Sequence, residues 1–399
     1  MRSFSYCVPT EVVFGEGSLS QLGEKIRACG ASRILLVYGG GSAKRSGLLD
    51  RVSELLRQAG IEWIELGGVQ PNPRVSLARE GVRRALDFGA ELILAVGGGS
   101  VIDTAKAVAH GTANPQTDLW EFWKKRAELT RTLPVGVVLT IPAAGSETSD
   151  SAVLTNAEES EKRGLNTRFN RPVFAIMDPT VAATLPKQQL HCGVTDIMMH
   201  TLDRYFNPNT DNDVTDEIAE AILRVVIRHG PAVCADPANV RAMSEVMWAG
   251  SLSHNGLTGL GGIRDFTVHQ LGHALSEKYD VYHGESLSSV WASWARYAMP
   301  SDPARFARYA ENVWGLREPT QEQTALAGIA ATEAFFRSIG APVCFAELPT
   351  GKLSQDELED LAMRCTYRKT RTIGAFRVLN YDDILKIYCM ANGQEGEKR

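Results

Sequence analysis

The sequence has few cysteines, no long apolar run and no signal-like start, and each shortage excludes a class of protein. Its seven cysteines are odd in number and widely scattered, with no Cys-x-x-Cys pair, which argues against a disulfide framework or a structural zinc site. No stretch approaches the roughly 20 apolar residues of a membrane span, and the N-terminus lacks a charged start followed by an apolar run. We therefore expect reduced thiols, a cytoplasmic location and no membrane partner.

An excess of positive charge is also missing. The chain has 42 Lys plus Arg against 47 Asp plus Glu, a formal net charge of -5, so no overall basic field exists to hold a nucleic-acid backbone. The 44% hydrophobic and 22% charged fractions are those of a folded globular protein. At roughly 150 residues per domain, 399 residues predict two or three domains and no nucleic-acid partner.

The first half of the chain alternates short apolar runs with amphipathic stretches, which is typical of parallel strands joined by crossover helices. The predicted strands, some of which run on into a loop, cover residues 33–41, 62–66, 91–100, 135–148 and 173–179. Helices are predicted over 48–58 and 76–88, and the segment after the third strand, VIDTAKAVAH, is also helix-like. An α/β domain with a parallel sheet and flanking helices is therefore expected over residues 1–189.

Beyond residue 189 the pattern becomes helical, with almost no β-branched runs between turn signals. The predicted helices cover residues 214–230, 239–255, 264–278, 285–299, 303–314, 319–339, 354–364 and 381–391. An all-helical domain is therefore expected over residues 190–399.

Two strand-to-helix junctions contain three consecutive glycines, at 39–41 and 97–99. Glycines let the backbone approach a ligand closely, and the following helix N-terminus favours an anion such as a pyrophosphate. Neither junction has the G-x-G-x-x-G spacing of the ordinary dinucleotide fingerprint. A tight turn needed only for packing is the alternative for each junction.

Polar residues near these junctions have two interpretations. Asp103 lies about one turn after the second junction. In one interpretation it contacts a ligand, and in the other it only complements the helix dipole. The loop over residues 142–149 carries hydroxyls at the expected carboxyl end of a strand. Those hydroxyls bind a ribose, amide or phosphate in one interpretation and cap the next helix in the other.

Histidines are few, but they gather with Asp196 in two segments of the helical half. Asp196 and His200 are four residues apart, as are His269 and His273, and His283 follows at a predicted corner. Residues four apart on a helix lie on one face and can bind one ion. One carboxylate with imidazoles suits Fe(II), Zn(II) or a similar first-row metal rather than Mg(II) or Ca(II). These are five candidates for four positions, so one histidine is expected to support the site or handle a proton.

Together these segments resemble the iron-containing (group III) alcohol dehydrogenases, and most closely their butanol dehydrogenase and broad aldehyde reductase branch. The resemblance runs over nearly the whole chain and is carried by several motifs that together are highly specific. They include VPTEVVFGEGSL, YGGGSAKRSGL, AVGGGSVIDTAKAVA, IPAAGSETSDSAVLTN, GVTDIMMHTLDRYF and HQLGHALSEKYDVYHGESL.

The resemblance implies a dinucleotide-binding domain, a helical metal domain, a substrate cleft between them and a homodimer. It assigns the metal to Asp196, His200, His269 and His283, and places His273 next to nicotinamide and substrate as a catalytic residue, with Asp103 helping to hold the cofactor. The implied cofactor contacts are Gly39, Gly40, Ser42, Asn72, Gly98, Gly99, Ser100, Asp103, Thr140, Ser149 and Lys162. At the last position the neighbouring Arg163 is also eligible, because both lie in the charged stretch EESEKRGL.

The leading functional hypothesis is a metal-dependent NAD(P)(H) oxidoreductase that interconverts primary alcohols and aldehydes, with the metal as Lewis acid. One alternative resembles the dehydroquinate synthases, but few basic residues, chiefly Arg204 and Arg264, flank the predicted ligands. A nucleotide- and metal-binding protein without turnover is the other alternative. Six aromatics are candidates for an apolar substrate wall, although a core position is the commoner fate: Trp120, Phe122, Trp123, Phe266, Trp291 and Trp294.

Cofactor choice is predicted from the residues after the first strand of the α/β domain. NAD-selective sites commonly place a carboxylate there, which repels the 2′-phosphate of NADP. Here no acidic residue occurs between Val37 and Asp50, and Lys44 or Arg45 with Ser42 could bind the phosphate. NADP(H) is therefore expected to be preferred, with NAD(H) also accepted if the two cations only face solvent.

Overall fold

The structure is a computed structural model that describes residues 1–159, 161–208 and 211–393. It contains two compact units. One comprises Cys7–Leu185 with Asp236–Asn255, and the other comprises Met1–Tyr6, Pro186–Ala235 and Gly256–Arg399. The division after Leu185 lies close to the predicted boundary at residue 189, but the segment Asp236–Asn255 groups with the N-terminal half, which the sequence analysis did not anticipate.

A six-stranded, fully parallel sheet forms the centre of the first unit, which confirms the predicted fold class. In sheet order the strands are β1 (Glu11–Phe14), β8 (Phe174–Met177), β5 (Val135–Leu139), β4 (Leu92–Gly97), β2 (Arg33–Gly39) and β3 (Glu62–Val69). Strand β1, which the sequence analysis missed, pairs only through four residues with β8 at the sheet edge.

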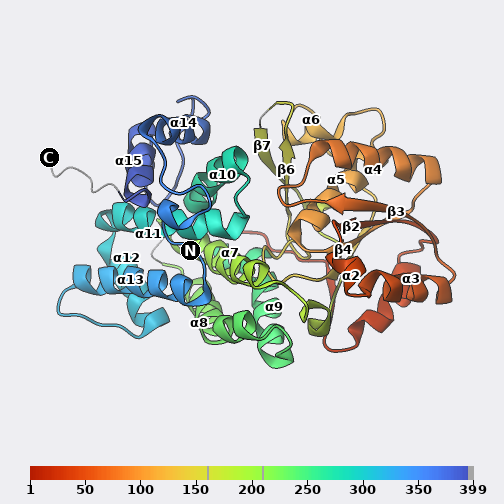
Figure 1. The fold of residues 1–399 in the computed structure, drawn as a ribbon, viewed down its shortest axis with the longest axis horizontal. Helices are drawn as coiled ribbons and strands as arrows, with labels where there is room; N and C mark the ends of the chain where they lie inside the picture. Colours follow the sequence, from red (N-terminus) through yellow and green to blue (C-terminus); the bar gives the residue numbers. More distant parts are fainter. Residues whose placement is uncertain (160, 209–210, 394–399) are drawn as a thin grey trace. The chain divides into compact units, whose positions relative to one another are not determined.

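Helices cover both faces of this sheet (Figure 1). Alternate residues of β2 and β4, such as Leu36 and Leu94, share a buried apolar cluster with helices α1 (Leu22–Ala28) and α3 (Leu48–Gln58). The intervening residues are also fully buried and point to the opposite face. That face is covered by α4 (Val75–Phe88) and α5 (Gly99–Ala113). Burial on both faces explains why the strands are continuous apolar runs.

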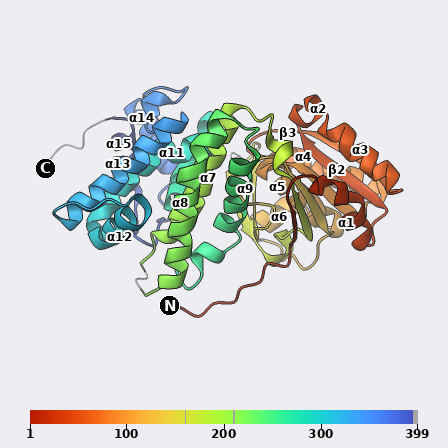
Figure 2. The ribbon, with the colours of Figure 1, turned by 90° about the horizontal axis from the view of Figure 1, so that it is seen from below.

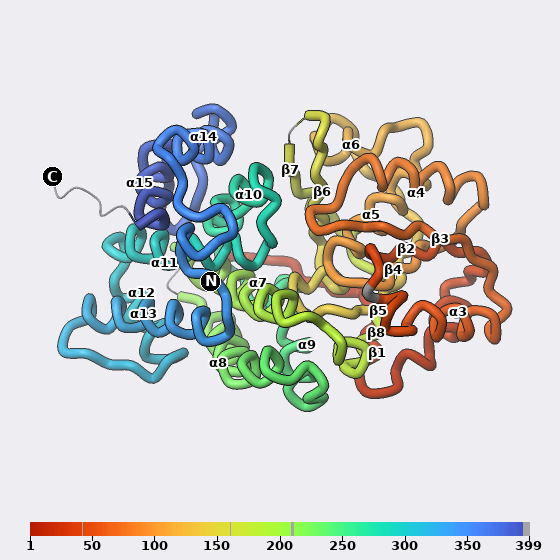
Figure 3. Tube along the Cα trace, viewed as in Figure 1, coloured from red at the N-terminus to blue at the C-terminus, as the bar shows by residue number. Residues whose placement is uncertain are grey.

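A two-stranded antiparallel hairpin, β6 (Ser151–Asn156) and β7 (Glu161–Asn166), was not predicted (Figure 3). The sequence of β7, EKRGLN, is largely polar and has no buried residue, so it carries no strand periodicity. The unit also contains the short helices α2 (Ser42–Arg45) and α6 (Leu119–Trp123) and the longer helix α9 (Val240–His254).

The second unit is built from helices, as predicted. Their bounds are α7 (Lys187–Tyr205), α8 (Asp213–Ala235), α10 (Thr267–Tyr279), α11 (His283–Ala298), α12 (Pro303–Tyr309), α13 (Gln321–Ile339), α14 (Gln355–Cys365) and α15 (Tyr381–Ala391). The helix predicted over 303–314 is α12 followed by a π-helical segment, Ala310–Trp314. Helices α7 and α8 run side by side (Figure 2). Within the described residues, no helix combines the length and apolarity that crossing a membrane requires.

Candidate metal centre and nucleotide-binding edge

Three of the predicted ligands converge within the second unit. Asp196 and His200 lie one turn apart on α7, and His269 comes from the first turn of α10. Each of the three is only 4% exposed, and one ligand atom from each lies within 4.8 Å of the others. Buried carboxylate and imidazole groups gathered in this way form a donor set that suits a first-row metal ion.

The Asp196 carboxylate is the centre of this arrangement. Its Oδ1 lies 3.3 Å from Nε2 of His200, 3.7 Å from Nε2 of His269 and 3.5 Å from Nε2 of His283. Ligands at 2.0–2.2 Å from a tetrahedral ion stand about 3.3–3.6 Å apart, since a tetrahedron's edge is about 1.6 times the distance from its centre to a vertex. The distances from Asp196 to the three histidines are therefore close to those of ligands that share one divalent ion. Asp196, His200 and His269 are the three whose ligand atoms all lie close to one another, and His283 approaches them through Asp196.

The fourth donor, His283, differs from the others in exposure. It is the first residue of α11, and its side chain is 30% exposed. A carboxylate and two histidines are thus buried, whereas the third histidine is accessible. A site with one accessible side suits catalysis, because a substrate oxygen needs an approach to the ion.

Asp203, which the sequence analysis did not single out, orients one of the histidines. Its Oδ2 lies 2.6 Å from Nδ1 of His269 and also accepts a hydrogen bond from the backbone N–H of His269 at 3.2 Å. This contact directs Nε2 towards Asp196. Burial alone would lower the pKa of His269, but hydrogen bonds and charge from Asp196 and Asp203 outweigh it and raise the pKa, so the environment favours a cation.

Asp203→Asn is expected to weaken metal binding by about 10- to 100-fold, as loss of an outer partner of a metal-bound histidine commonly does. An amide cannot supply the charge that stabilises the His269 orientation. Competition with a chelator, followed by elemental analysis, measures the effect. Unchanged affinity in this variant would show that Asp203 only fills space.

His273 lies beside the metal-binding cluster rather than in it. It stands one turn after His269 on α10, with its ring centroid 6.3 Å from that of His269 and 5.6 Å from that of His283. Among the described residues, the group of ligand atoms within 4.8 Å consists of Asp196, His200 and His269 and includes neither His273 nor His283; His283 is assigned to the centre by the 3.5 Å distance from its Nε2 to Asp196 Oδ1. The half-buried position of His273 next to the accessible His283 is compatible with the predicted proton-handling role.

A strained turn places Phe266 next to the same histidines. Phe266 has a φ of 55°, which is rare for a bulky residue, and it immediately precedes α10. The Asp265 carboxylate holds this turn by accepting backbone N–H groups of Thr267, Ala375 and Phe376. The Phe266 ring lies 5.4 Å from the ring of His269 and 6.3 Å from that of His200. Of the six candidate aromatics, Phe266 thus lies at the metal centre.

The remaining candidates are core residues. Trp291 and Trp294 of the second unit and Trp120, Phe122 and Trp123 of the first are all at most 2% exposed. Their burial supports the structural interpretation that the sequence analysis had kept open for aromatics.

In the first unit, the two glycine junctions meet at one point of the sheet. Strand β2 lies between β3 and β4, so the chain order reverses between β2 and β4. In open parallel sheets the crevice beyond the carboxyl ends at such a reversal is where ligands bind. Gly39 ends β2 and Gly97 ends β4, so both junctions lie at this reversal. Sequence alone did not show that they were neighbours.

The start of α5 is suited to an anion. The 15-residue helix begins at Gly99 after Gly98, and no side chain caps it and no acidic residue occupies its first turn. A Cβ on Gly98 would lie 2.9 Å from the Ile141 side chain, so a larger residue here would press on Ile141. Thr140 is next to it, with its backbone N–H donating to the carbonyl of Gly97 at 3.1 Å. Gly98, Gly99, Ser100 and Thr140 therefore share the sheet edge at which the cofactor contacts were predicted.

Asp103 ties α5 to the hydroxyl-rich loop and the hairpin. Its Oδ1 accepts from the Ser146 hydroxyl at 2.7 Å and its Oδ2 from the Val153 N–H at 2.8 Å. Only 14% of its side chain is exposed, so the interpretation as a surface residue complementing the helix dipole is wrong. The contacts give Asp103 a positioning role, and its predicted contact with a cofactor stays a prediction.

Lys106, about one turn further along α5, also binds the hydroxyl-rich loop and the hairpin. It is fully buried and donates to the Ser146 carbonyl, the Ser146 hydroxyl and the Ser151 carbonyl, each at 2.8 Å. Burial lowers the pKa of Lys106 to about 8, although the nearby carboxylates oppose that shift. Burial also raises the pKa of the Asp103 carboxyl despite the charge of Lys106. The loop over residues 142–149 is therefore held by a buried ionic network.

The other predicted cofactor contacts lie around this edge. Asn72, buried and with a φ of 56°, accepts a hydrogen bond from the Lys162 ammonium at 2.9 Å, so Lys162 rather than Arg163 points to this side. Ser149 is fully buried, with its hydroxyl 3.4 Å from the Ser151 carbonyl. Gly40 lies in the turn after β2. The side chain of Ser42 lies outside the described part of the structure.

Comparison with protein families matches both halves of the chain. The model described as iron-containing alcohol dehydrogenase matches residues 9–179. The model of the C-terminal part of the Fe-containing alcohol dehydrogenase family matches residues 191–392.

Individual relatives agree with this result. NADH-dependent butanol dehydrogenase A of Clostridium acetobutylicum is 39% identical over 390 residues, which cover 97% of this chain and 99% of the relative. The NADPH-dependent aldehyde reductase YqhD of Escherichia coli is 35% identical over 344 residues, covering 86% and 88%. The crystal structure of NADH-dependent butanol dehydrogenase A from Thermotoga maritima superposes with a TM-score of 0.93 at 33% identity, covering 98% of this chain and 99% of that one. With its ligand cluster, its glycine-lined sheet edge and these matches, the chain belongs to the iron-containing alcohol dehydrogenase family.

Proposed function

We propose that this protein interconverts aldehydes and primary alcohols with NADP(H) as the preferred cofactor, at a metal centre made by Asp196, His200, His269 and His283. The observation that carries the proposal is the spacing of three imidazole nitrogens around one carboxylate oxygen, at 3.3 to 3.7 Å. Fe(II) and Zn(II) both suit these donors, and elemental analysis of the purified protein distinguishes them.

The ion and the nicotinamide supply one part of the chemistry, and the residues of the chain supply the other. When bound, the divalent ion supplies a Lewis acid for the substrate oxygen and the nicotinamide supplies or accepts the hydride. The chain positions the side chains around the ion. Asp203 fixes the His269 ring, and Asp265 holds the turn that places Phe266 beside the ligands. His273 moves a proton to or from the substrate oxygen through a ring nitrogen, directly or through water.

Turnover with simple substrates tests the proposal. We expect reduction of a series of C2 to C8 aldehydes, followed as oxidation of NADPH, and the reverse reaction with the matching alcohols. Activity should disappear on removal of the ion with a chelator and return on adding Fe(II) or Zn(II). Absence of turnover with every aldehyde, in protein that is folded and metal-loaded, would contradict the proposed function.

The preference for NADP(H) rests on the charge carried by the turn and helix after β2. Lys44 and Arg45 are exposed cations in α2, and no acidic residue occurs in the first turn of that helix. The Arg45 guanidinium folds back over the glycine turn, with Nη1 2.8 Å from where a Cβ on Gly41 would stand. Because the matched relatives include NADH- and NADPH-dependent enzymes, membership of the family does not choose between the cofactors.

Gly39→Asp is expected to lower kcat/KM for NADPH on the order of 10²-fold, because a carboxylate beside the 2′-phosphate costs several kcal/mol, with little loss for NADH. A Cβ at this position finds its nearest neighbours at 3.6 and 3.9 Å, which is ordinary contact, so the backbone here accepts a Cβ. Gly39→Asn is the matched control, since it adds the same volume without charge. Steady-state kinetics with both cofactors measure the ratio, and a wild-type preference for NADH would overturn the assignment.

The two alternative functions are not favoured, because both halves of the chain match alcohol dehydrogenase models. Arg204, one of the two basic residues considered for lyase chemistry, is buried, donates to the His200 carbonyl and lies over the Phe266 ring. The expected homodimer and cytoplasmic location stay predictions, which sedimentation of the purified protein and cell fractionation test.

A further inference from the structure

A second group of ligating side chains lies on the helices that carry the metal centre. His191 and Cys192 belong to α7 and Glu285 to the first turn of α11. One ligand atom from each of the three lies within 4.8 Å of the others, and Nε2 of His191 is 3.2 Å from Oε1 of Glu285. His191 is 8% and Glu285 6% exposed, while Cys192 is half-buried. This cluster shares no residue with the centre at Asp196.

A close approach of two helices brings these side chains together. At Gly284, a Cβ would stand 2.4 Å from the carbonyl oxygen of Cys192 and 2.5 Å from its Cα, so the backbones of α11 and α7 touch where only glycine fits. The neighbouring Glu285 is thereby held against the turn of α7 that carries His191 and Cys192. The three donors therefore belong to a close crossing of two helices.

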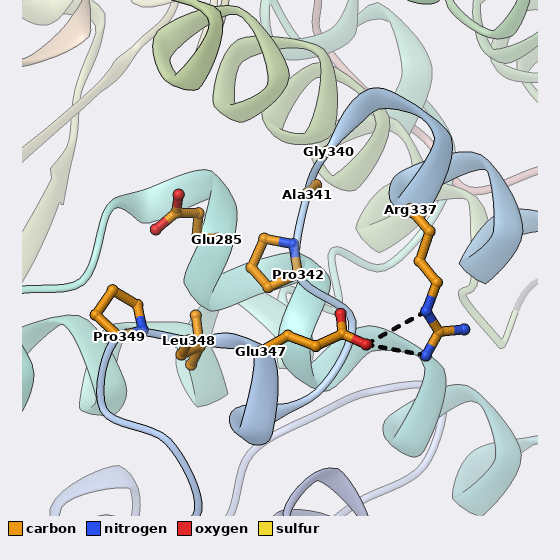
Figure 4. A pocket seen from close by; sticks show the side chains of 8 residues that line it. All are labelled: Glu285, Arg337, Gly340, Ala341, Pro342, Glu347, Leu348 and Pro349. Atoms are coloured by element: carbon orange, nitrogen blue, oxygen red, sulfur yellow. Dashed lines mark hydrogen bonds and ion pairs between the residues drawn. The ribbon is translucent and has the colours of Figure 1, made fainter.

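A cavity of about 540 Å³ lies beside this crossing, and Glu285 is one of the residues that line it (Figure 4). The guanidinium that lines the cavity, Arg337, is engaged by Glu347 at 3.2 Å, and the Glu285 carboxylate points away from that pair. Glu285 Oε1 instead accepts from Gln188 at 2.9 Å and faces His191. The Glu285 carboxylate therefore faces His191 and does not pair with Arg337.

We propose that His191, Cys192 and Glu285 form a second metal site, selective for Zn(II) and similar thiolate-binding ions, with water as the remaining ligand. A thiolate, an imidazole and a carboxylate are all established zinc ligands, and the thiolate distinguishes this site from the sulfur-free centre at Asp196. On binding, the Cys192 S–H bond breaks, a sulfur–metal bond forms and the proton leaves to solvent. The ion would fasten the start of α11, which carries His283, to α7, which carries Asp196.

Cobalt substitution tests the proposal, because a thiolate ligand gives Co(II) an intense near-ultraviolet charge-transfer absorption that carboxylate and imidazole ligands do not. The full chain in its Co(II) form is expected to show this absorption and to hold a second equivalent of metal. Cys192→Ser should abolish the absorption and weaken the second equivalent by more than the 10- to 100-fold typical of losing an outer partner. Cys344→Ser, also a half-buried thiol, is the matched control and should keep both.

Two further variants separate this site from the proposed catalytic centre. Asp196→Ala should keep the thiolate absorption, so a failure of the catalytic proposal leaves this result intact. His191→Asn should keep the thiol but lower the affinity, which covers the case in which Cys192→Ser does not fold. A Co(II) form without thiolate absorption, or an absorption that survives Cys192→Ser, overturns the second site.

Discussion

Asp196→Ala is expected to abolish binding of the catalytic ion and to lower aldehyde reduction by at least about 10³-fold, since the Lewis acid contributes several kcal/mol to the transition state. Asp196 supplies the one oxygen donor and the one negative charge among the four ligands. Its Oδ1 lies within 3.7 Å of all three histidine nitrogens, so its loss removes the donor that the three histidines share. His200→Ala, His269→Ala and His283→Ala should have the same consequence.

Metal content and nucleotide affinity must be measured together in these variants. Elemental analysis is best done in a Cys192→Ser background, so that only the centre at Asp196 is counted. NADPH binding, followed by fluorescence, should be largely retained, because the glycine junctions belong to the other unit of the chain. His229→Ala, on α8, is the matched histidine control and should keep full metal occupancy. Full occupancy in His269→Ala would remove that residue from the ligand set.

His273→Ala is expected to keep the metal and lose about 10²- to 10⁴-fold in kcat, the range for a positioned proton-transfer group. The basis is its place one turn from His269, with ring centroids 6.3 Å apart, outside the cluster of ligand atoms. Removing it leaves the four donors around Asp196 unchanged and takes away only the group that handles the proton.

Pairing this variant with His269→Ala makes the assignment decisive, since the two residues are four apart on one helix. In the Cys192→Ser background, His273→Ala should show normal metal content with slow turnover, whereas His269→Ala should show neither metal nor turnover. The opposite pattern would mean that the two roles are exchanged. Normal kcat in metal-loaded His273→Ala would remove the proton-handling role altogether.

The elements that sequence predicted well are those with strong, uninterrupted periodicity. Helices α3 and α15 have the predicted bounds, and the strands β2, β4 and β5 begin within one residue of the predicted starts. Strand β1 and the hairpin strands β6 and β7 were missed, and β1 and β7 were missed for the same reason. Each is short or polar, and each exists through pairing with a partner strand, β8 or β6, rather than through a pattern of its own.

The candidate metal ligands were visible in the sequence because spacing of four residues on a helix is a local property. Asp203 was not, although it lies seven residues after Asp196 on the same helix. Its function depends on a histidine 66 residues away, and no local pattern records such a contact. Asp103 was noticed, but its attachment to Ser146 and Val153 also spans a distance that sequence spacing does not reveal.

By itself, the sequence determined the parallel α/β half, the helical half, the glycine junctions and the candidate metal-binding donors. Those features are encoded by periodicity and spacing within single segments, where residue type and position along one helix or strand are enough. Only the tertiary structure decided that both junctions lie where the strand order reverses, that Asp203 orients His269, and that Gly284 brings Glu285 to His191 and Cys192. Each of these depends on packing between segments far apart in the chain, where close approach of backbones and burial of charge select the partners.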